Sequence, residues 1–166
     1  KILKQVIHNK PQIGKVNGLY ASSVDGLGGI TIIEALEIPT DSKLQLELTG
    51  NQGNVMKESM KVARSISWNL ISEKTKKYFN EKWSSSGNTG FHIHCPEAAT
   101  PKDGPSAGAA IVLCIISRLI NQPIDHEIAL TGEINLTGNV TQIGGLDNKL
   151  FGAKQAGVKK VIIPKE

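Results

Sequence analysis

A tight turn that runs directly into an apolar helix constrains this chain more than any other feature. Residues 101–108 read Pro-Lys-Asp-Gly-Pro-Ser-Ala-Gly, and the apolar segment 107–120 follows without a break. The prolines and glycines indicate the turn, and the apolar run indicates a helix. Ser106 is therefore expected at the positive end of a helix, where unpaired backbone N–H groups favour a developing oxyanion.

The hydroxyl of Ser106 allows two interpretations. Serine is common near helix starts because its oxygen accepts hydrogen bonds from free N–H groups, so Ser106 could serve only as a cap. As a nucleophile it needs a group that takes its proton, and Lys149, early in a second expected helix, is the candidate. Serine with lysine, and no third acid, is a known variant of the nucleophile-and-base arrangement.

Lys149 can act as a base only if its pKa is lowered. Most lysines on helices are solvated, and a free lysine, with a pKa of about 10.4, is almost fully protonated near neutral pH. Burial disfavours the charged form of the lysine. The positive N-terminal end of the helix that carries the lysine, just before it in the chain, has the same effect. A catalytic Lys149 is therefore expected to be buried close to the start of its helix.

Three segments of the chain resemble the signature segments of the Lon protease proteolytic domain. They are residues 96–108, 130–138 and 143–150, and their order and spacing match as well. The resemblance extends from about Gly14 to the last residue and is strongest after Phe91. It implies a ribosomal-S5-domain-2-like fold and a serine endopeptidase with a Ser/Lys dyad.

This resemblance also implies roles for single residues. Ser106 would be the nucleophile and Lys149 the base, and the hydroxyl of Thr131 would orient the lysine amine. From the geometry of the turn, the backbone N–H groups of Asp103, Gly104 and Ser106 are the candidates for an oxyanion hole. Asp103 suggests a Ser-His-Asp triad, but it lies in the same loop as Ser106, and the Lon pattern uses no such acid.

The sequence offers one weak metal-site pattern. His92 and His94 alternate on an expected strand and therefore share a face, where Cys95 or Asp103 could add a ligand. No His-Glu-x-x-His or paired Cys-x-x-Cys supports such a site. Lon-like sequences carry histidines here without using a metal, so we expect structural packing and no metal.

Glu133 is expected to form a structural salt bridge.

Composition narrows the class of protein and its partners. The 166 residues fit one domain, and 39% hydrophobic with 20% charged residues is ordinary for a soluble globular protein. The net charge of +4 is mild and the lysines are scattered, so nucleic-acid binding is not expected. No run reaches the roughly 18 apolar residues of a membrane span. Cys95 and Cys114 are expected as buried thiols, which fits an intracellular protein of the cytoplasm, or of the mitochondrial matrix in a eukaryote.

Strands and helices interleave along the chain without a strict βαβ repeat. Residues 1–13 are expected to form a linker or N-terminal arm, and residues 14–166 a Lon-type proteolytic domain truncated at its C-terminal end. The order of elements indicates the class α+β (mixed α/β). Strands are expected over residues 15–38 (two, around a turn), 44–48, 91–95, 127–131, 133–140 and 158–164, and helices over residues 55–79, 107–120 and 146–156, with a polar break at residues 83–88.

The segment 18–29 departs from the usual pattern of the family it resembles. Ala21 stands where a tryptophan is common, and the hairpin that follows is longer. In similar domains this edge lies beside the substrate. The departure therefore bears on substrate preference and not on the chemistry.

Three functions are compatible with these residues. The first is the peptidase domain of an ATP-dependent protease that degrades unfolded or misfolded polypeptides, for which the resemblance implies a homo-hexameric ring. No cofactor is expected in this domain, and no Gly-x-x-x-x-Gly-Lys-Ser/Thr loop occurs, so ATP and Mg²⁺ are implied only for an ATPase domain outside these residues. The second is a free-standing or self-processing Lon-like peptidase. The third is a non-enzymatic Lon-like binding domain, against which the pair Ser106 and Lys149 argues.

Overall fold

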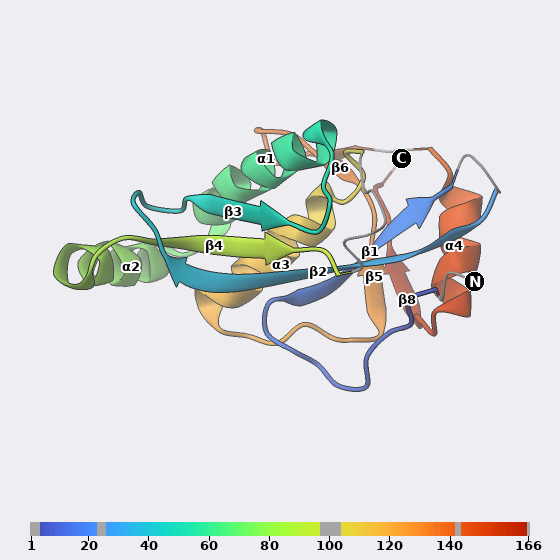
Figure 1. Ribbon diagram of the computed structural model, residues 1–166, viewed down its shortest axis with the longest axis horizontal. Coiled ribbons are helices and arrows are strands. Elements are labelled where there is room, and N and C mark those ends of the chain that lie inside the picture. The colour runs from blue at the N-terminus through green and yellow to red at the C-terminus, as the bar shows by residue number, and fades with distance from the viewer. Residues whose placement is uncertain (1–3, 23–25, 97–103, 142–143, 166) are drawn as a thin grey trace.

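A six-stranded mixed sheet forms the centre of the structure, in the order β3–β4–β2–β1–β5–β8 (Figure 1). The structure is a computed structural model and describes residues 4–22, 26–96, 104–141 and 144–165. The strands of this sheet are β1 (Lys15–Ala21), β2 (Gly28–Pro39), β3 (Leu46–Thr49), β4 (Thr89–His94), β5 (Ile128–Leu130) and β8 (Lys160–Ile162). A small second sheet pairs β6 (Glu133–Ile134) with β7 (Val140–Thr141). The helices are α1 (Asn54–Leu70), α2 (Glu73–Ser86), α3 (Gly108–Ile120) and α4 (Leu146–Gln155).

The strands of the central sheet pair in both directions. β2 runs antiparallel to β1 and to β4, whereas the pairs β3–β4, β1–β5 and β5–β8 are parallel. The strand, turn and strand expected over residues 15–38 form the β1–β2 hairpin, in which Ala21 lies opposite Gly28. These elements confirm the predicted class, α+β (mixed α/β).

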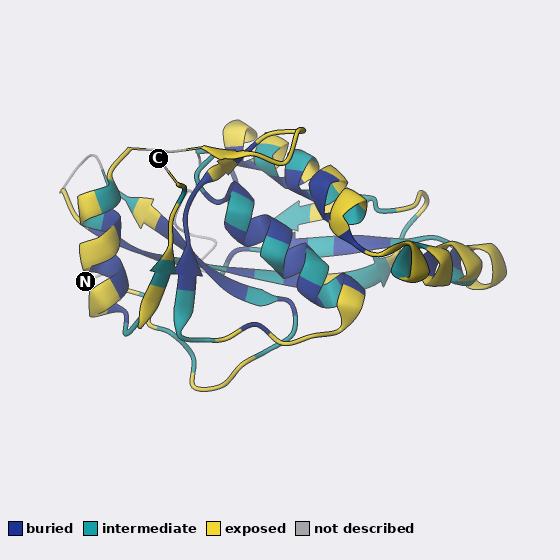
Figure 2. Cartoon of the chain, turned by 180° about the vertical axis from the view of Figure 1, so that it is seen from behind, coloured by how far each residue is buried: buried dark blue, intermediate teal, exposed yellow. Residues whose placement is uncertain are grey.

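The two faces of the sheet are covered by different helices because neighbouring strand residues point to opposite sides. Val16 and Ile33 belong to the larger core, which α1 and α3 complete behind the strands in Figure 1. Leu19 and Ile30 face the other way and pack with Ala153 of α4. Figure 2 shows the buried side of α3 running along the sheet, with the outer surfaces of α2 and α4 exposed. The carboxyl end of β5 thus lies between α3 on one face and α4 on the other.

The single helix expected over residues 55–79 is wrong, because the structure has two helices there. α1 ends at Leu70, and α2 begins at Glu73 and continues to Ser86, into the segment expected as a polar break. Ser72 caps α2, since its Oγ accepts a hydrogen bond from the backbone N–H of Thr75 at 3.1 Å. The apolar spacing that predicted one helix runs on through Ile71, which is buried between the two helices.

The single strand expected over residues 133–140 is also wrong, because a turn divides it into β6 and β7. The Asn135 side chain makes this turn: its Oδ1 accepts hydrogen bonds from the backbone N–H groups of Thr137 and Asn139, both at 3.1 Å. Gly138 follows in a left-handed conformation, with φ of 84°. An Asx-type turn therefore overrides the strand pattern.

Residues 4–12 lie along the domain. The backbone N–H of Ile7 donates to the carbonyl of Ala156 at 3.0 Å, which ties the segment to the end of α4. Gln12 forms an isolated antiparallel bridge with Ile124, in the connection between α3 and β5. These contacts hold the segment against the domain, and the linker or arm expected over residues 1–13 stays a prediction.

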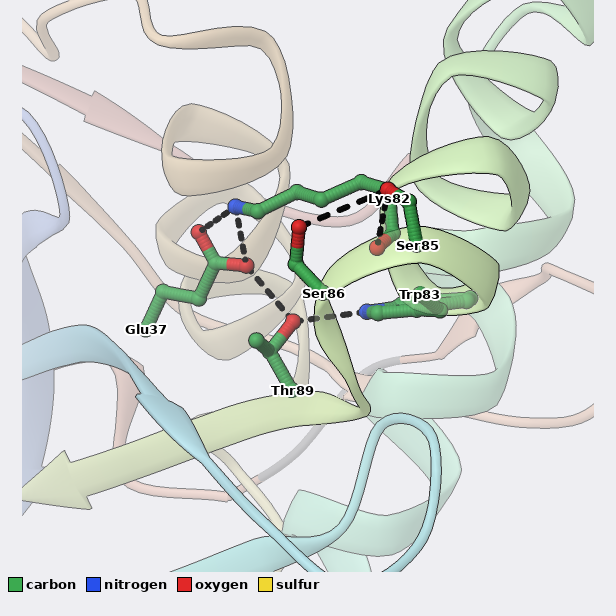
Figure 3. A network of polar contacts seen from close by, with 6 residues as sticks. All are labelled: Glu37, Lys82, Trp83, Ser85, Ser86 and Thr89. Atoms are coloured by element: carbon green, nitrogen blue, oxygen red, sulfur yellow. Dashed lines mark hydrogen bonds and ion pairs between the residues drawn. The ribbon is translucent and has the colours of Figure 1, made fainter.

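A network of polar contacts fastens α2 to the sheet (Figure 3). The Lys82 ammonium donates to both carboxylate oxygens of Glu37 on β2, at 3.1 and 3.0 Å. The Thr89 hydroxyl donates to the same carboxylate at 2.6 Å and accepts from the indole N–H of Trp83 at 2.7 Å. Because Trp83 is buried, this hydroxyl satisfies a donor that water does not reach.

Thr89→Val is therefore expected to destabilise the domain by about 1–3 kcal/mol, the cost of leaving a buried donor unsatisfied. Chemical or thermal unfolding measures the loss. Ser85→Ala is the matched control within the same network, because it removes only exposed contacts to the Lys82 carbonyl and the Ser86 hydroxyl. The control should change the free energy of unfolding by less than about 0.5 kcal/mol. Equal stabilities of the two variants would contradict the role given to Thr89.

Candidate functional site

Ser106 lies in the turn immediately before α3, as the sequence predicts. The N-cap of that helix is Ala107, and no side chain caps the helix. Ser106 therefore does not act as the cap. Two N–H groups at the helix start already have acceptors: Gly108 donates to the Pro105 carbonyl at 3.3 Å and Ala109 to the Gly132 carbonyl at 3.1 Å. An oxyanion would therefore be received by the turn before the helix rather than by these two groups.

The serine turn is bound to the segment that follows β5. The backbone N–H of Gly132 donates to the carbonyl of Ser106 at 2.8 Å, and the carbonyl of Gly132 accepts from the N–H of Ala109. On the other side, the N–H of Thr131 donates to the carbonyl of Ile162 on β8 at 3.1 Å. These bonds fix the position of Ser106 relative to Thr131 through the backbone.

Lys149 is buried, with 4% of its surface exposed. α4 begins at Leu146 after Gly145, whose φ of 76° is left-handed, so the lysine stands within the first turns of its helix. Its Nζ donates to the Oγ1 of Thr131 at 3.3 Å, and Thr131 is only 2% exposed. The structure thus brings together the lysine and the threonine that the sequence analysis paired.

Burial lowers the pKa of Lys149 below its ordinary value of 10.5. The start of α4 acts in the same direction, because the positive end of a helix disfavours a nearby cation. Within the described residues, no carboxylate forms an ion pair with this ammonium group. A buried lysine with a hydroxyl partner and no counter-ion is suited to hold its amine neutral, as a base must.

Ser106, in the turn before α3, and Lys149, on α4, are each hydrogen-bonded to one of the two residues that follow β5. The connection runs from the Ser106 carbonyl to Gly132, then along the chain to Thr131 and its hydroxyl, and from there to the amine. In the described part of the chain, no hydrogen bond joins the Ser106 hydroxyl to the Lys149 amine. Direct proton transfer between them requires the hydroxyl and the amine to come within hydrogen-bond distance of each other.

Of the residues expected in the oxyanion hole, Gly104 lies beside the serine in an open position. Its φ is 110°, and among the described residues no atom beyond its chain neighbours lies within 4 Å of where a Cβ would stand. That space and the missing side chain allow a substrate to come close to the backbone. Asp103 lies outside the described residues. Glu133, expected in a salt bridge, is exposed and has no ion pair with another described residue.

The two histidines that suggested a metal site are hydrogen-bonded to a neighbouring strand. His92 and His94 both contact the hydroxyl of Thr49 on β3, at 2.8 and 2.7 Å. Among the described residues, no three His, Cys, Asp or Glu side chains are grouped as a metal site would need. Cys95 and Cys114 are both buried, as expected, and burial raises the pKa of the Cys114 thiol.

Two glycines that no sequence motif singles out, Gly28 and Gly152, bring α4 close to the β1–β2 hairpin. A Cβ added to Gly152 would overlap the backbone of Gly28 and Gly29, and a Cβ added to Gly28 would overlap the carbonyl of Asn148. The signal for these contacts was only the presence of Gly152 inside a predicted helix and of Gly28 in the turn expected between two strands. Glycine in such positions marks a close approach of two backbones.

Comparison with known proteins gives the class of this domain, which is that of a protease. The chain belongs to the family of Lon protease (S16) C-terminal proteolytic domains, whose model matches residues 1–166. It is 43% identical over 155 residues to a Lon protease of Fusobacterium nucleatum, covering 93% of this chain and 19% of that protein. It is 40% identical over 165 residues to Lon protease 2 of Thermus thermophilus, covering 99% and 19%.

A mitochondrial Lon protease homolog of Yarrowia lipolytica is 44% identical over 162 residues, which cover 94% of this chain and 13% of that protein. The chain therefore spans about a fifth or less of the length of these relatives. Bacterial and mitochondrial proteins occur among them, so the family does not fix a compartment. None of the helices in the described ranges has the length and apolar character that crossing a membrane requires.

Proposed function

We propose that this domain hydrolyses peptide bonds with Ser106 as the nucleophile and Lys149 as the general base. The observation that carries the proposal is the buried Lys149 amine at the Thr131 hydroxyl, beside the turn that holds the serine. A buried lysine with no ion pair to any described residue is costly to the fold, and catalysis gives a reason for it. Membership of the Lon proteolytic-domain family supports the same chemistry.

In this mechanism, Lys149 takes the proton of the Ser106 hydroxyl while Oγ attacks the carbonyl carbon of the scissile bond. The carbonyl oxygen becomes an oxyanion, which the backbone N–H groups of Gly104 and Ser106, together with Asp103, would receive. The protonated lysine then gives its proton to the leaving amine, and an acyl-enzyme remains. Water attacks the ester with the neutral amine again as base, and this step frees the serine.

Thr131 supports the base in this scheme. Its Oγ1 accepts a hydrogen bond from the amine at 3.3 Å, and the strand end that carries it is fixed to β8 and to the serine turn. A bond from one N–H of the lysine leaves the nitrogen lone pair free to point elsewhere. The threonine therefore orients the lone pair towards the serine rather than competing for it.

For the whole protein we propose an ATP-dependent protease of protein quality control, which degrades unfolded or misfolded polypeptides as a homo-hexamer. ATP and Mg²⁺ would act on an ATPase domain outside these residues. The rival reading is a free-standing or self-processing Lon-like peptidase. The isolated domain is expected to cleave small or unfolded peptides slowly, independently of ATP, and to leave stably folded proteins intact. Efficient digestion of a folded protein by the domain alone would favour the rival.

The pH dependence of hydrolysis tests the dyad. Because only the neutral amine accepts a proton, kcat/KM should rise with pH through an apparent pKa well below 10.5, the ordinary value for lysine. A peptide boronate should modify Ser106 and protect it from reaction with a fluorophosphonate, read by mass spectrometry. A basic limb that begins only near pH 10 would count against Lys149, and labelling at another serine would count against Ser106.

A further inference from the structure

α4 carries the proposed base, so its distance from the sheet decides where the amine of Lys149 lies. The buried face of this helix consists of Lys149, Gly152 and Ala153. It packs on β1 and β2, at the end of the sheet where the hairpin turns (Figure 1). The helix starts without a side-chain cap, so its first turn has no local anchor of that kind. Packing on the hairpin must supply the anchor.

The hairpin and the helix meet backbone to backbone. A Cβ on Gly152 would lie well inside van der Waals contact with the carbonyl group of Gly28 and the nitrogen of Gly29. From the opposite side, a Cβ on Gly28 would overlap the carbonyl oxygen of Asn148 and lie 2.7 Å from its carbon. All of these atoms are main-chain atoms, which cannot swing aside as the end of a side chain can.

The residues of α4 that make this contact lie on both sides of the proposed base in the chain. Asn148 precedes Lys149 directly, and Gly152 follows it one turn later on the same face, so the touching turn is the one that carries the lysine. Two further contacts hold the hairpin and α4 in place. The Lys4 ammonium donates to the Gly28 carbonyl at 3.4 Å, and the Ile7 N–H donates to the Ala156 carbonyl at 3.0 Å.

We propose that Gly28 and Gly152 are positioning residues, which set the depth of α4 on the sheet and thereby place the Lys149 amine at the Thr131 hydroxyl. The inference rests on the proposed function, in which Lys149 is the base. Carbon atoms that do not share a bond approach to about 3.5–4.0 Å, so one added methyl group must move the two backbones apart by roughly 1 Å. A misplacement of that size can lower a catalytic rate by up to about 100-fold.

Gly152→Ala is the principal test, with Gly28→Ala as its counterpart on the hairpin. We expect both variants to fold and to lose roughly 10- to 100-fold in kcat, and Gly152→Ala, which lies outside the hairpin, to keep KM for a fluorogenic peptide within about twofold. The pKa of Lys149 should move up towards its ordinary value, because the displaced amine is better hydrated. NMR of lysine labelled with ¹³C measures this pKa without any need for activity, with the signal assigned by its loss in Lys149→Met.

Two glycine variants separate positioning from general damage. Gly90 lies on β4, far from α4, and Gly90→Ala places a Cβ against the backbone of Gln45. This variant should lower stability but keep kcat and the Lys149 pKa. Gly29→Ala lies on the same hairpin, but its Cβ meets the Tyr20 side chain. It should also leave the Lys149 pKa unchanged. A shift in either control as large as in Gly152→Ala would overturn the proposal.

The proposal also fails if Gly152→Ala and Gly28→Ala fold and both retain the wild-type kcat and Lys149 pKa. If the added methyl groups prevent folding, Ile30→Val loosens the packing of α4 on β2 without a clash. The glycine contact would still set the separation, so an unchanged Lys149 pKa supports the proposal and a shifted one refutes it. A Lys149→Met variant that remains active would instead refute the proposed function and leave the pKa comparison valid.

Discussion

Ser106→Ala is expected to abolish peptide hydrolysis while the domain stays folded and as stable as the wild type. The variant removes the only atom that forms the acyl bond, so kcat should fall by a factor on the order of 10⁴ or more. Stability should not change, because the Ser106 hydroxyl makes no hydrogen bond with another described residue. A fluorogenic peptide assay measures the rate, and circular dichroism with thermal unfolding measures the fold.

Ser117→Ala is the matched control on α3. This serine is buried, and its hydroxyl accepts from the Gly14 N–H at 2.8 Å and donates to the Gln122 carbonyl at 2.6 Å. Its loss should cost about 1–3 kcal/mol of stability and leave kcat unchanged at temperatures where the variant is folded. The two serine variants should therefore have opposite effects. Turnover near the wild-type rate in Ser106→Ala would rule out the nucleophile assigned here.

Lys149→Met is expected to do two things at once: abolish hydrolysis and raise the melting temperature. Methionine fills nearly the same volume without a charge, so the fold no longer holds an ammonium group away from water. A gain of a few degrees in Tm is the expected size, and it is the pattern of a site where function costs stability. Hydrolysis fails because no amine remains to accept the serine proton.

The stability gain should depend on pH in a defined direction. Below the lowered pKa of Lys149 the folded protein carries the buried charge, so the advantage of Lys149→Met is largest there. Between that pKa and 10.5 the unfolded chain binds the proton more readily than the folded one, so the wild type gains stability as pH rises. The difference between the two proteins should thus shrink towards pH 10.5.

Lys154→Met controls for the loss of a lysine from α4, because Lys154 is exposed on the same helix. It should keep both hydrolysis and the pH dependence of the wild type. Unfolding by urea at a series of pH values, with each variant beside the wild type, measures the difference. A Lys149→Met protein that is less stable than the wild type throughout this range would show that the lysine supports the fold.

The sequence predicted most elements because their patterns are local. The helices α3 and α4 and the hairpin β1–β2 are bounded by glycine and proline signals within a few residues of where the structure has them. The two errors have local causes as well. Ser72 begins a new helix inside an apolar pattern that continues, and Asn135 bends a strand-like segment through its side chain. In both cases a polar side chain that bonds the backbone outweighs the spacing of apolar residues.

The chemistry of the site could be predicted in part. The turn before α3 and the lysine early on α4 are visible in the sequence, and the resemblance to a known family pairs them with Thr131. The burial of Lys149, its bond to Thr131 and the contact between Gly28 and Gly152 depend on segments that lie far apart in the sequence. No local pattern reports such distances. Tertiary packing alone decides them.

The order of strands in the central sheet also has a consequence for how the chain is completed during synthesis. Asn17 on β1 donates to the carbonyl of Ile128 beside it on β5, 111 positions later in the chain. The hairpin β1–β2 and the helices α1 and α2 can form as they leave the ribosome, but pairing across so long an interval comes late. Thr131 and Lys149 belong to this late part. In a nascent chain Ser106 therefore emerges well before Lys149, and under the proposed mechanism hydrolytic activity appears only after α4 packs on the sheet.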